Sequence, residues 1–482
     1  MSARTFPSER LLAHVWETQA FAAVSLRAID GQAVEILWRG RKNLDAGPDF
    51  LDALIRIGGR LRDGDVELHV RSSDWRAHGH ERDPHYARVI LHVVIDADGA
   101  PVRINGEDVP TLAVAPLLAA PIDRLREQFE QAEAERVRRL EACQASLRRV
   151  PVDDLLAKIK TFGKIRLLER ARRFGKWLPQ ASFQQMLYQA ICEGLGYSSN
   201  KQAFLELACR LPLDAIAAHL PDADAPLAPE RMLWIQAALF GAAGLLPDAP
   251  RRSKSCPALA REIDAETEAH LARLREAWNA IQPTLNIEPM TPEQWRFFRM
   301  RPVNFPTRRL AALSELIARY IAQPPLEHYL KLFTIPADVA PRAQAVALFE
   351  RTLEIPVSGY WKGRMLFGRP RAPERDRFFF GASRIRDILI SAVMPVCLLY
   401  AQRQARPDME AQIFAWLAIL PSPLPNAVSR RMTAHLFGQR TIPPRRLRRA
   451  DVYQGMLHLD RRYCSLAACQ QCLCYGQSRQ TP

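Results

Sequence analysis

The sequence predicts an α/β (α+β) domain with a small sheet, followed by a large and mostly α-helical region. Three observations support this prediction. Strand-like alternation of apolar residues is confined to the first 115 residues, helical spacing dominates after them, and the net charge changes sign there. Residues 1–115 hold 14 basic and 17 acidic residues, net −3, whereas residues 116–482 hold 53 and 35, net +18. We expect a sheet domain at 1–115, a basic helical region at 116–450 and a cysteine-rich segment at 451–482.

The first domain begins with a predicted helix over residues 8–20, in which Ser8 is placed to cap the N-terminus. Apolar residues from Leu11 to Trp16 follow at helical spacing. The period then changes to two in four segments that are rich in β-branched residues and separated by turn signals. These predicted strands are 34–39, 50–57, 65–70 and 89–95.

Beyond Pro116 strand patterns nearly vanish and helical segments follow one another, with prolines at helix starts and in loops. The predicted helices are 119–149, 152–177, 183–193, 229–245, 258–281, 308–321 and 340–351. Exposed linkers are expected at 249–257, 421–426 and 440–449.

The composition is that of a folded soluble protein, since 48% of the residues are hydrophobic and 25% are charged. The longest apolar stretch, 388–400, has 13 residues and is too short to span a membrane, so we expect it to form a buried helix. The first residues lack the apolar core of a signal peptide, and the scattered cysteines show no disulfide framework. We therefore expect a cytoplasmic protein.

Two carboxylates, Asp49 and Glu67, are predicted to arrive on neighbouring strands, and His69 lies two residues after Glu67. Because strand side chains alternate, Glu67 and His69 share one face while their neighbours point to the apolar face. If the strand that begins at Asp49 pairs with the strand of Glu67, the two carboxylates can share Mg²⁺ or Mn²⁺, which prefer carboxylate oxygen.

The motifs Pro48-Asp49 and Glu67-Leu68-His69 resemble the signature of the PD-(D/E)xK phosphodiesterase superfamily, with His69 where lysine usually stands. The predicted order of helix, three strands, loop or short helix, and strand agrees with that superfamily. The resemblance covers about residues 8–96 and implies a restriction-endonuclease-like fold, nuclease activity and a supporting acid at Glu17. It also implies that Asp49 and Glu67 hold the metal while His69 positions or deprotonates the attacking water.

Further motifs look like those of a bacterial family catalogued as domain of unknown function 2851, over nearly the whole chain. They are 47–50, 64–69, 72–75, 78–80, 89–94, 301–306 and Tyr463-Cys464 with Cys469 and Cys472. This resemblance implies no established activity.

Five of the eleven histidines fall within 24 residues, at His69, His78, His80, His85 and His92. A His-x-His pair with a strand histidine and Asp74 could bind Zn²⁺, which would make a metallohydrolase. The other interpretation is that His92 is a core residue and that the loop histidines only decorate a polar surface.

The C-terminal segment contains Cys464, Cys469, Cys472 and Cys474 in a C-x4-C-x2-C-x-C run. Thiols on one tight loop can ligate zinc or an iron–sulfur cluster. A fourth ligand could instead be His458 or a distant cysteine, and an unligated cysteine-rich tail is the alternative.

Residues 295–309 interleave arginines with aromatic residues, and seven more arginines lie in 430–449. Arginine binds phosphate bidentately and aromatic rings stack on bases, although such residues also form solvated faces and cores. We predict that the nucleic-acid contacts are Arg296, Arg299, Arg301, Arg308 and Arg309.

The leading hypothesis is a metal-dependent nuclease-like protein that acts on or binds nucleic acid, with Mg²⁺ or Mn²⁺ at the carboxylates. One alternative is an inactive nucleic-acid-binding or assembly protein on the same fold. Another is a zinc metallohydrolase that uses the histidine cluster. The sequence contains no P-loop, dinucleotide fingerprint or serine-hydrolase elbow, so those classes lack their usual signatures.

Overall fold

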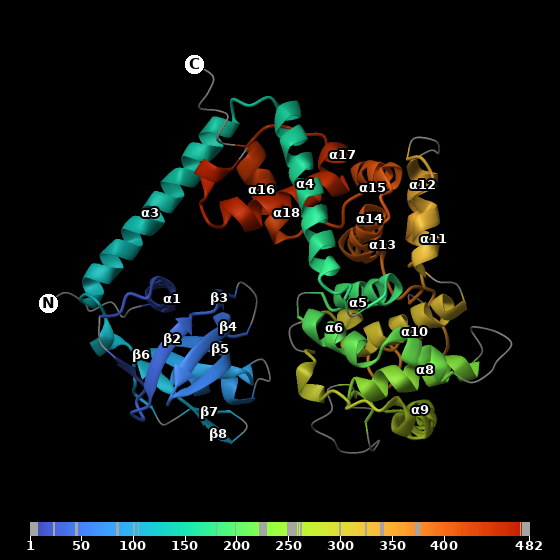
Figure 1. Cartoon of the computed structure of the whole chain (residues 1–482), viewed down its shortest axis with the longest axis horizontal. Coiled ribbons are helices and arrows are strands. Elements are labelled where there is room, and N and C mark those ends of the chain that lie inside the picture. The colour runs from blue at the N-terminus through green and yellow to red at the C-terminus, as the bar shows by residue number, and fades with distance from the viewer. Residues whose placement is uncertain are drawn as a thin grey trace. The chain divides into compact units, whose positions relative to one another are not determined.

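The computed structural model divides the chain into two compact units, Met1–Arg139 and Leu140–Pro482, here named the sheet unit and the helical unit (Figure 1). A mixed sheet lies in the first and helices build the second, which confirms the predicted order of the two classes. The structure describes residues 8–22, 25–43, 47–82, 86–99, 102–104, 106–179, 181–197, 199–220, 229–247, 258, 260, 263–297, 300–322, 325–337, 342–371, 376–472 and 474. The linker predicted at 249–257 lies outside these residues.

The sheet unit begins with α1 (Glu9–Thr18), close to the predicted helix. The Ser8 side chain accepts a hydrogen bond from the Leu11 amide at 3.3 Å, so the predicted cap is present. The helix ends where Gln19 takes a left-handed conformation with φ of 53°. Leu12 and Trp16 on its inner face are buried against the sheet.

The main sheet has the order β1-β2-β4-β5-β6-β9, with the short β3 also paired to β4. Strands β1, β2, β4 and β5 pair antiparallel, whereas β6 runs parallel to both β5 and β9. The bounds are β1 Leu26–Arg27, β2 Ala33–Trp38, β3 Arg41–Lys42, β4 Phe50–Ile57, β5 Arg60–Arg71, β6 Val89–Asp96 and β9 Thr111–Ala113. A separate pair is formed by β7 Val102–Ile104 and β8 Glu107–Val109.

The sheet carries a different cluster of side chains on each face. Val66 and Leu68 of β5 point into the core shared with α1, as the alternation predicted. The other face carries Glu67 and His69, next to a smaller apolar cluster that includes Trp75 of α2 (Asp74–Ala77). This second face holds the candidate site.

The helical unit is a stack of helices around one large core. Its helices are α4 Val152–Gly175, α5 Phe183–Leu195, α6 Lys201–Arg210, α7 Leu213–Ala218, α8 Pro229–Ala242, α9 Ala265–Leu285, α10 Pro306–Ala322, α11 Pro325–Leu332, α12 Arg342–Arg351, α13 Ala382–Ile388, α14 Met394–Arg403, α15 Pro407–Ile419, α16 Ala427–Phe437, α17 Pro444–Leu447 and α18 Ala450–Leu459. The helix predicted from residue 258 begins at Ala265, because Asp264 caps it by accepting a hydrogen bond from the Thr267 amide at 2.9 Å.

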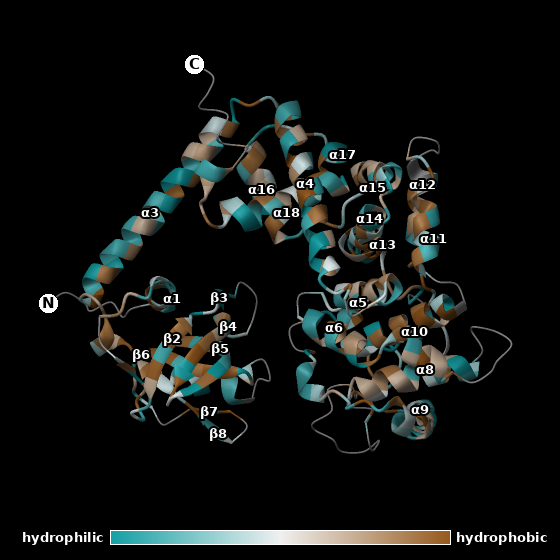
Figure 2. Ribbon diagram, in the orientation of Figure 1, coloured by the Kyte–Doolittle hydropathy of each residue, from teal (hydrophilic) through white to brown (hydrophobic). Residues whose placement is uncertain are grey.

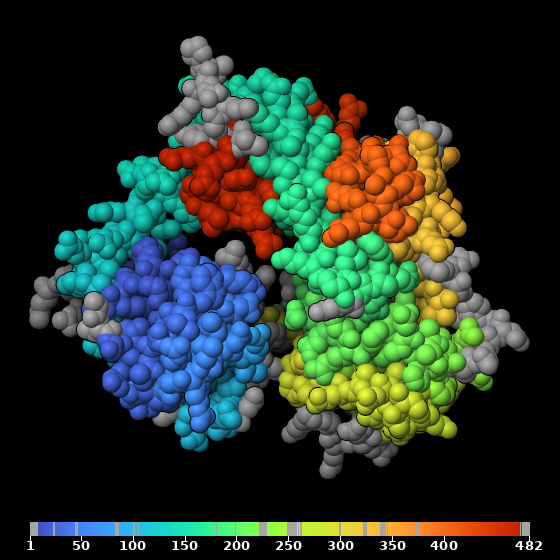
Figure 3. Space-filling model, in the orientation of Figure 1, coloured from blue at the N-terminus to red at the C-terminus, as the bar shows by residue number. Residues whose placement is uncertain are grey.

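Helices α4 and α18 cross closely because each presents a glycine to the other. A Cβ atom added to Gly163 would collide with the Asp451 carbonyl, and one added to Gly455 would collide with the Ile159 carbonyl. Figure 3 shows the C-terminal helices in red directly against α4 in green. By contrast, the long helix α3 (Ile122–Leu147) is largely hydrophilic in Figure 2.

One continuous helical stretch, Ala382–Arg403, is long and apolar enough to cross a membrane by length and composition. Its most apolar window is 72% buried inside the structure, as expected for a core helix of a soluble protein. The buried helix predicted at 388–400 lies within this stretch.

Candidate metal centre

The two predicted carboxylates meet where β4 begins beside β5. The Asp49 amide donates a hydrogen bond to Oε2 of Glu67 at 3.0 Å, and the Leu68 amide donates one to Oδ2 of Asp49 at 3.0 Å. Each carboxylate therefore accepts from the backbone of the other strand. Glu67 is 5% exposed and Asp49 is half-buried, so the pair sits at the margin of the solvent.

Four histidines gather next to Glu67 on the same face of the sheet. His69 Nε2 lies 3.2 Å from Nδ1 of His78, and His69 Nδ1 lies 2.9 Å from Nε2 of His92. The register explains the second contact, because Glu67 of β5 lies directly opposite His92 of the parallel strand β6. Oε1 of Glu67 lies 3.6 Å from Nε2 of His69 and 3.5 Å from Nε2 of His80.

Aromatic rings enclose this cluster. Trp75 lies edge-on to His69 and His80, with ring centroids 6.2 Å and 5.4 Å away. Tyr86 stacks on His80 at 3.8 Å. His80 and Tyr86 come from opposite sides of a loop, so the stacking holds the His78-x-His80 segment over the strand face. The apolar walls reduce solvation of every polar group inside them.

Burial and proximity shift the pKa values of four groups at the centre, Asp49, Glu67, His69 and His92. Burial, followed by the charge of Asp49, raises the pKa of Glu67 from 4.5 to about 9. Burial raises the pKa of Asp49 from 3.8 to about 6. Burial and the neighbouring imidazoles lower the pKa of His69 to about 2 and that of His92 to about 3. At neutral pH His69 and His92 are therefore uncharged, while Glu67 retains a proton that a bound cation would displace.

Three pairs of donor atoms lie close to the spacing that a single transition-metal ion requires. His69, His78 and His80 each offer a nitrogen within 4.8 Å of the others. Two donors bound at 2.0–2.1 Å to one tetrahedral ion lie about 3.3 Å apart, close to the contacts of 3.2, 3.5 and 3.6 Å at this centre. Imidazoles with a carboxylate suit Zn²⁺, Mn²⁺ or Fe²⁺ better than Mg²⁺, which prefers oxygen alone.

The acid expected from the first helix is corrected by the structure. Glu17 forms an ion pair with Lys42 of β3 at 3.2 Å. The acid of α1 whose charge raises the pKa of both Asp49 and Glu67 is Glu9, one residue after the cap. Lys42 also acts on Asp49, whose pKa its positive charge lowers. Nothing in the sequence apart from their charge pointed to Glu9 or Lys42.

Two other residues of the histidine hypothesis are placed differently. Asp74, the first residue of α2, accepts a hydrogen bond from the Arg71 amide at 3.0 Å. His92 is fully buried and contacts His69 rather than joining the three-histidine group. His85 lies outside the described residues.

The predicted arginine contacts are corrected in part. Arg308 is 2% exposed and pairs with Asp376 at 2.6 Å, and Arg309 is 3% exposed and donates to Oδ1 of Asn304 at 2.6 Å. Neither side chain is available to a phosphate, because both are used inside the core. Arg301 is exposed, Arg296 is half-buried and Arg299 lies outside the described residues.

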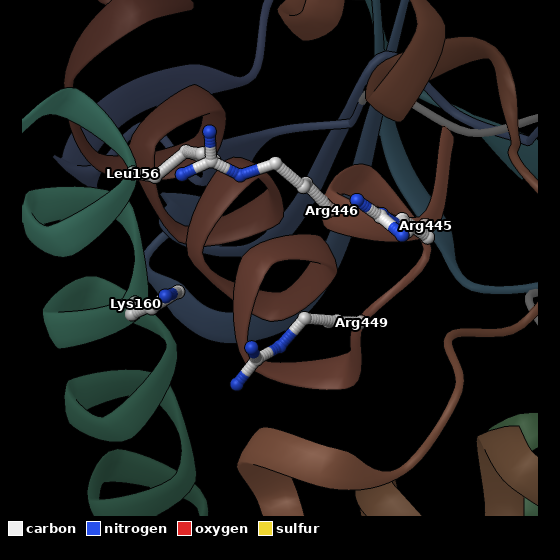
Figure 4. Close-up of a pocket in the computed structure, with 5 residues that line it drawn as sticks. All are labelled: Leu156, Lys160, Arg445, Arg446 and Arg449. Carbon is white, nitrogen blue, oxygen red and sulfur yellow. The ribbon is translucent and has the colours of Figure 1, made fainter. Parts of the chain in front are cut away.

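A second basic site forms where α17 and the start of α18 face α4. Leu156, Lys160, Arg445, Arg446 and Arg449 line a cavity of about 210 Å³. Figure 4 shows Arg446 and Arg449 extending from the C-terminal elements toward α4, which contributes Leu156 and Lys160. Arg446 pairs with Asp153 and Arg449 with Asp451, whereas Lys160 and Arg445 form no ion pair within the described residues. The cavity therefore retains positive charge that suits a phosphate.

Cys469, Cys472 and Cys474 lie in a buried cluster with Cys143 of α3, and the partly buried Cys464 packs against it. No local pattern predicts the presence of Cys143 there. His458, considered as a ligand, instead lies 3.4 Å from Glu169 and stacks on Phe162. The candidate metal ligands of this cluster are therefore cysteine sulfurs.

Comparison with known proteins gives one finding. No curated protein and no solved structure matches the chain. The model of one protein family, described as "Protein of unknown function (DUF2851)", matches residues 9–423. That span includes Asp49, Glu67 and the histidines, and ends before the C-terminal cysteines. Since the match covers most of the sequence, the chain belongs to the DUF2851 family.

Proposed function

We propose that this protein is a divalent-metal-dependent phosphodiesterase that acts on nucleic acid. One observation carries the proposal: the Asp49–Glu67 pair and the imidazoles of His69, His78 and His80 converge on one partly buried face of the sheet. Buried acids with neutral imidazoles form a costly arrangement unless a cation completes it.

The residues divide into two roles. His69, His78, His80 and Glu67 hold the ion, which would polarise a phosphoryl oxygen and lower the pKa of a bound water. Asp49 stays outside this set and accepts a proton from the attacking water, since its pKa of about 6 suits a general base near neutrality. In this proposal His69 is a metal ligand rather than a substitute for the lysine of the PD-(D/E)xK signature.

Two observations favour a phosphodiester as the substrate. The helical unit has 48 basic and 30 acidic residues, and its cavity beside α4 gathers four cations. The order α1, three antiparallel strands, the short α2 and then a parallel strand also agrees with a restriction-endonuclease-like core. The chain departs from that core at its second helix, since α2 spans only four residues.

The test is cleavage of labelled single-stranded DNA, double-stranded DNA and RNA in Mn²⁺, Zn²⁺ or Mg²⁺. We expect cleavage in Mn²⁺ or Zn²⁺, and a loss of about 100-fold or more in Asp49→Asn, as for removal of a general base. Asp63→Asn is the matched control, because Asp63 is an exposed carboxylate of β5 that pairs with Arg88. Wild-type protein that binds metal but cleaves none of these substrates would refute the catalytic proposal.

A second candidate is a nucleic-acid-binding protein that has lost the chemistry. It is favoured by the use of one oxygen of each carboxylate in a backbone hydrogen bond, since such bonds can hold the strands together without an ion. Salt-sensitive binding that is equal in wild type and Asp49→Asn, with no turnover in either, would select it.

A third candidate is a zinc hydrolase of small molecules, favoured by the imidazole donors. Zinc-dependent turnover of small esters or amides, with no effect on nucleic acid, would select it. The proposed cytoplasmic location agrees with every candidate but does not distinguish them.

A further inference from the structure

The cysteines of the C-terminal segment are brought together by two tight turns. A π-helical turn, Asp460–Cys464, follows α18, and the Ser465 amide donates to the Asp460 carbonyl at 2.9 Å. A second turn places the Cys472 amide 3.1 Å from the Cys469 carbonyl. The chain therefore folds back on itself, and Cys469 and Cys472 are buried.

Cys143 enters the same cluster from α3, 321 positions earlier in the sequence than Cys464. Its thiol shares a hydrogen bond with Cys469 and interacts electrostatically with Cys464 and Cys472. Cys464 in turn interacts with Cys469 and Cys472. These four cysteines thus belong to one cluster, in which no three of the sulfurs lie within 4.8 Å of one another.

Cys474 lies at the edge of this set. It hydrogen-bonds to Cys472 and interacts with Cys143. Lys158 also acts on Cys474, and Arg431 acts on Cys464, so positive charge lies near the cluster. Four thiolates around a divalent ion carry a net negative charge that such cations offset.

We propose that Cys143, Cys464, Cys469 and Cys472 form a tetrathiolate metal centre that joins α3 to the C-terminal segment. The donor chemistry is soft sulfur, which selects Zn²⁺ or an iron-containing centre over Mg²⁺ or Ca²⁺. Apolar side chains such as Leu147, Met456 and Leu459 enclose these thiols, and such burial favours neutral thiols over thiolates unless a metal ion binds the sulfurs. The sulfurs are gathered more loosely than the histidine nitrogens, and an ion would draw them to about 2.3 Å from itself.

The proposed centre has a structural role, because it cross-links α3 to the C-terminal turns. Apolar contacts and the Cys143–Cys469 hydrogen bond already join α3 to the C-terminal turns, and a metal would in addition close a loop of more than 300 residues and stabilise the folded state. This inference is independent of the proposed nuclease function, since its ligands lie in the helical unit.

The test is the metal content of full-length protein purified without oxygen. We expect one sulfur-ligated ion or cluster per chain, with X-ray absorption showing metal–sulfur distances of about 2.3 Å. Colourless protein with this signature contains zinc, and visible absorbance indicates an iron–sulfur centre; both support the proposal. Protein with no sulfur-ligated metal, even after reconstitution with Zn²⁺ or with iron and sulfide, would overturn it.

Single substitutions identify the ligands. Cys143→Ser and Cys469→Ser should lose the sulfur-ligated metal, whereas Cys397→Ser should retain it, because Cys397 is equally buried but distant from other thiols. A far-ultraviolet circular dichroism spectrum equal to that of wild type would show that Cys143→Ser is folded. Retention of the sulfur-ligated metal in Cys143→Ser would overturn the ligand assignment.

Discussion

Ionisable side chains are buried in both units, but their surroundings differ. In the helical unit, Arg308 pairs with Asp376 at 2.6 Å and Arg364 pairs with Asp264 at 3.1 Å. In the sheet unit the buried Glu67 faces imidazoles and the backbone, and within the described residues no lysine or arginine pairs with it. A buried arginine that pairs with an acid has a structural role. A buried acid that is surrounded by imidazoles indicates a cation-binding site.

Net charge alone does not show this difference. The sheet unit holds 19 basic and 22 acidic residues and the helical unit 48 and 30. Much of the excess in the helical unit is exposed, yet some of its arginines are core residues. Candidate binding sites are better indicated by ionisable groups without an ion-pair partner. Such groups lie in the sheet-unit centre and in the cavity beside α4.

The largest effect is expected from breaking a compensated pair. Arg308→Ala leaves Asp376 without its partner and should lower the free energy of unfolding by about 3–5 kcal/mol. Arg301→Ala, an exposed arginine of the same segment, should change it by less than about 0.5 kcal/mol. Urea unfolding followed by circular dichroism measures both. Equal effects would show that Arg308 is not a structural arginine.

In the sheet unit, replacing the buried Glu67 should lower metal affinity and raise the stability of the metal-free protein. Glu67→Gln should weaken metal binding by about 100-fold or more, because loss of even an outer-shell partner costs 10–100-fold. The metal-free variant should be more stable than metal-free wild type above pH 7, since no buried carboxyl group has to ionise. Calorimetric titration with Mn²⁺ and Zn²⁺ measures the first effect. Glu35→Gln, which alters an exposed acid of β2, is the control.

The stability of the metal-free sheet unit should fall as pH rises from 7 to 9. Glu67 keeps its proton up to about pH 9 in the folded state but loses it near 4.5 when unfolded, so the folded state binds more protons across this window. The expected slope is about −1.4 kcal/mol per pH unit at most. Asp49 is already ionised there in both states, and the sheet unit contains no cysteine.

Hydrogen exchange of the β5 amides measures this slope in the sheet unit alone. Saturating metal should abolish it, because the bound ion holds Glu67 ionised. A metal-free Glu67→Gln protein that shows the same slope as wild type would assign the effect to another group.

Local patterns predicted more of the fold than of the site. The cap at Ser8, the four main strands and the facing of Glu67 and His69 follow from periods of 3.6 and 2 and from short-range hydrogen bonds. Local patterns do not predict that Glu9 rather than Glu17 acts on Asp49 and Glu67, because this depends on how α1 packs on the sheet. That placement results from tertiary packing.

Longer-range contacts were beyond local patterns. The loop of His78 and His80 has no periodicity, so its position over β5 follows only from the stacking of Tyr86 and Trp75. Cys143 meets Cys469 across more than 300 residues. Arg308 lies among aromatic residues whether it binds phosphate or fills a core, and only the buried Asp376 contact distinguishes the two.

The smallest effect is expected at the cavity beside α4, where positive charge is left over. Lys160→Ala and Arg445→Ala should each weaken nucleic-acid binding only a few-fold at 0.15 M salt, and lower the slope of log K against log salt by about 1. Arg449→Ala should have less effect on the slope, because Arg449 already pairs with Asp451 at 3.3 Å. Fluorescence anisotropy over a salt series measures this, with the exposed Arg403→Ala as control. Slopes equal to wild type in both Lys160→Ala and Arg445→Ala would show that this cavity does not contact nucleic acid. Substrate binding by the sheet-unit centre would then depend on other residues.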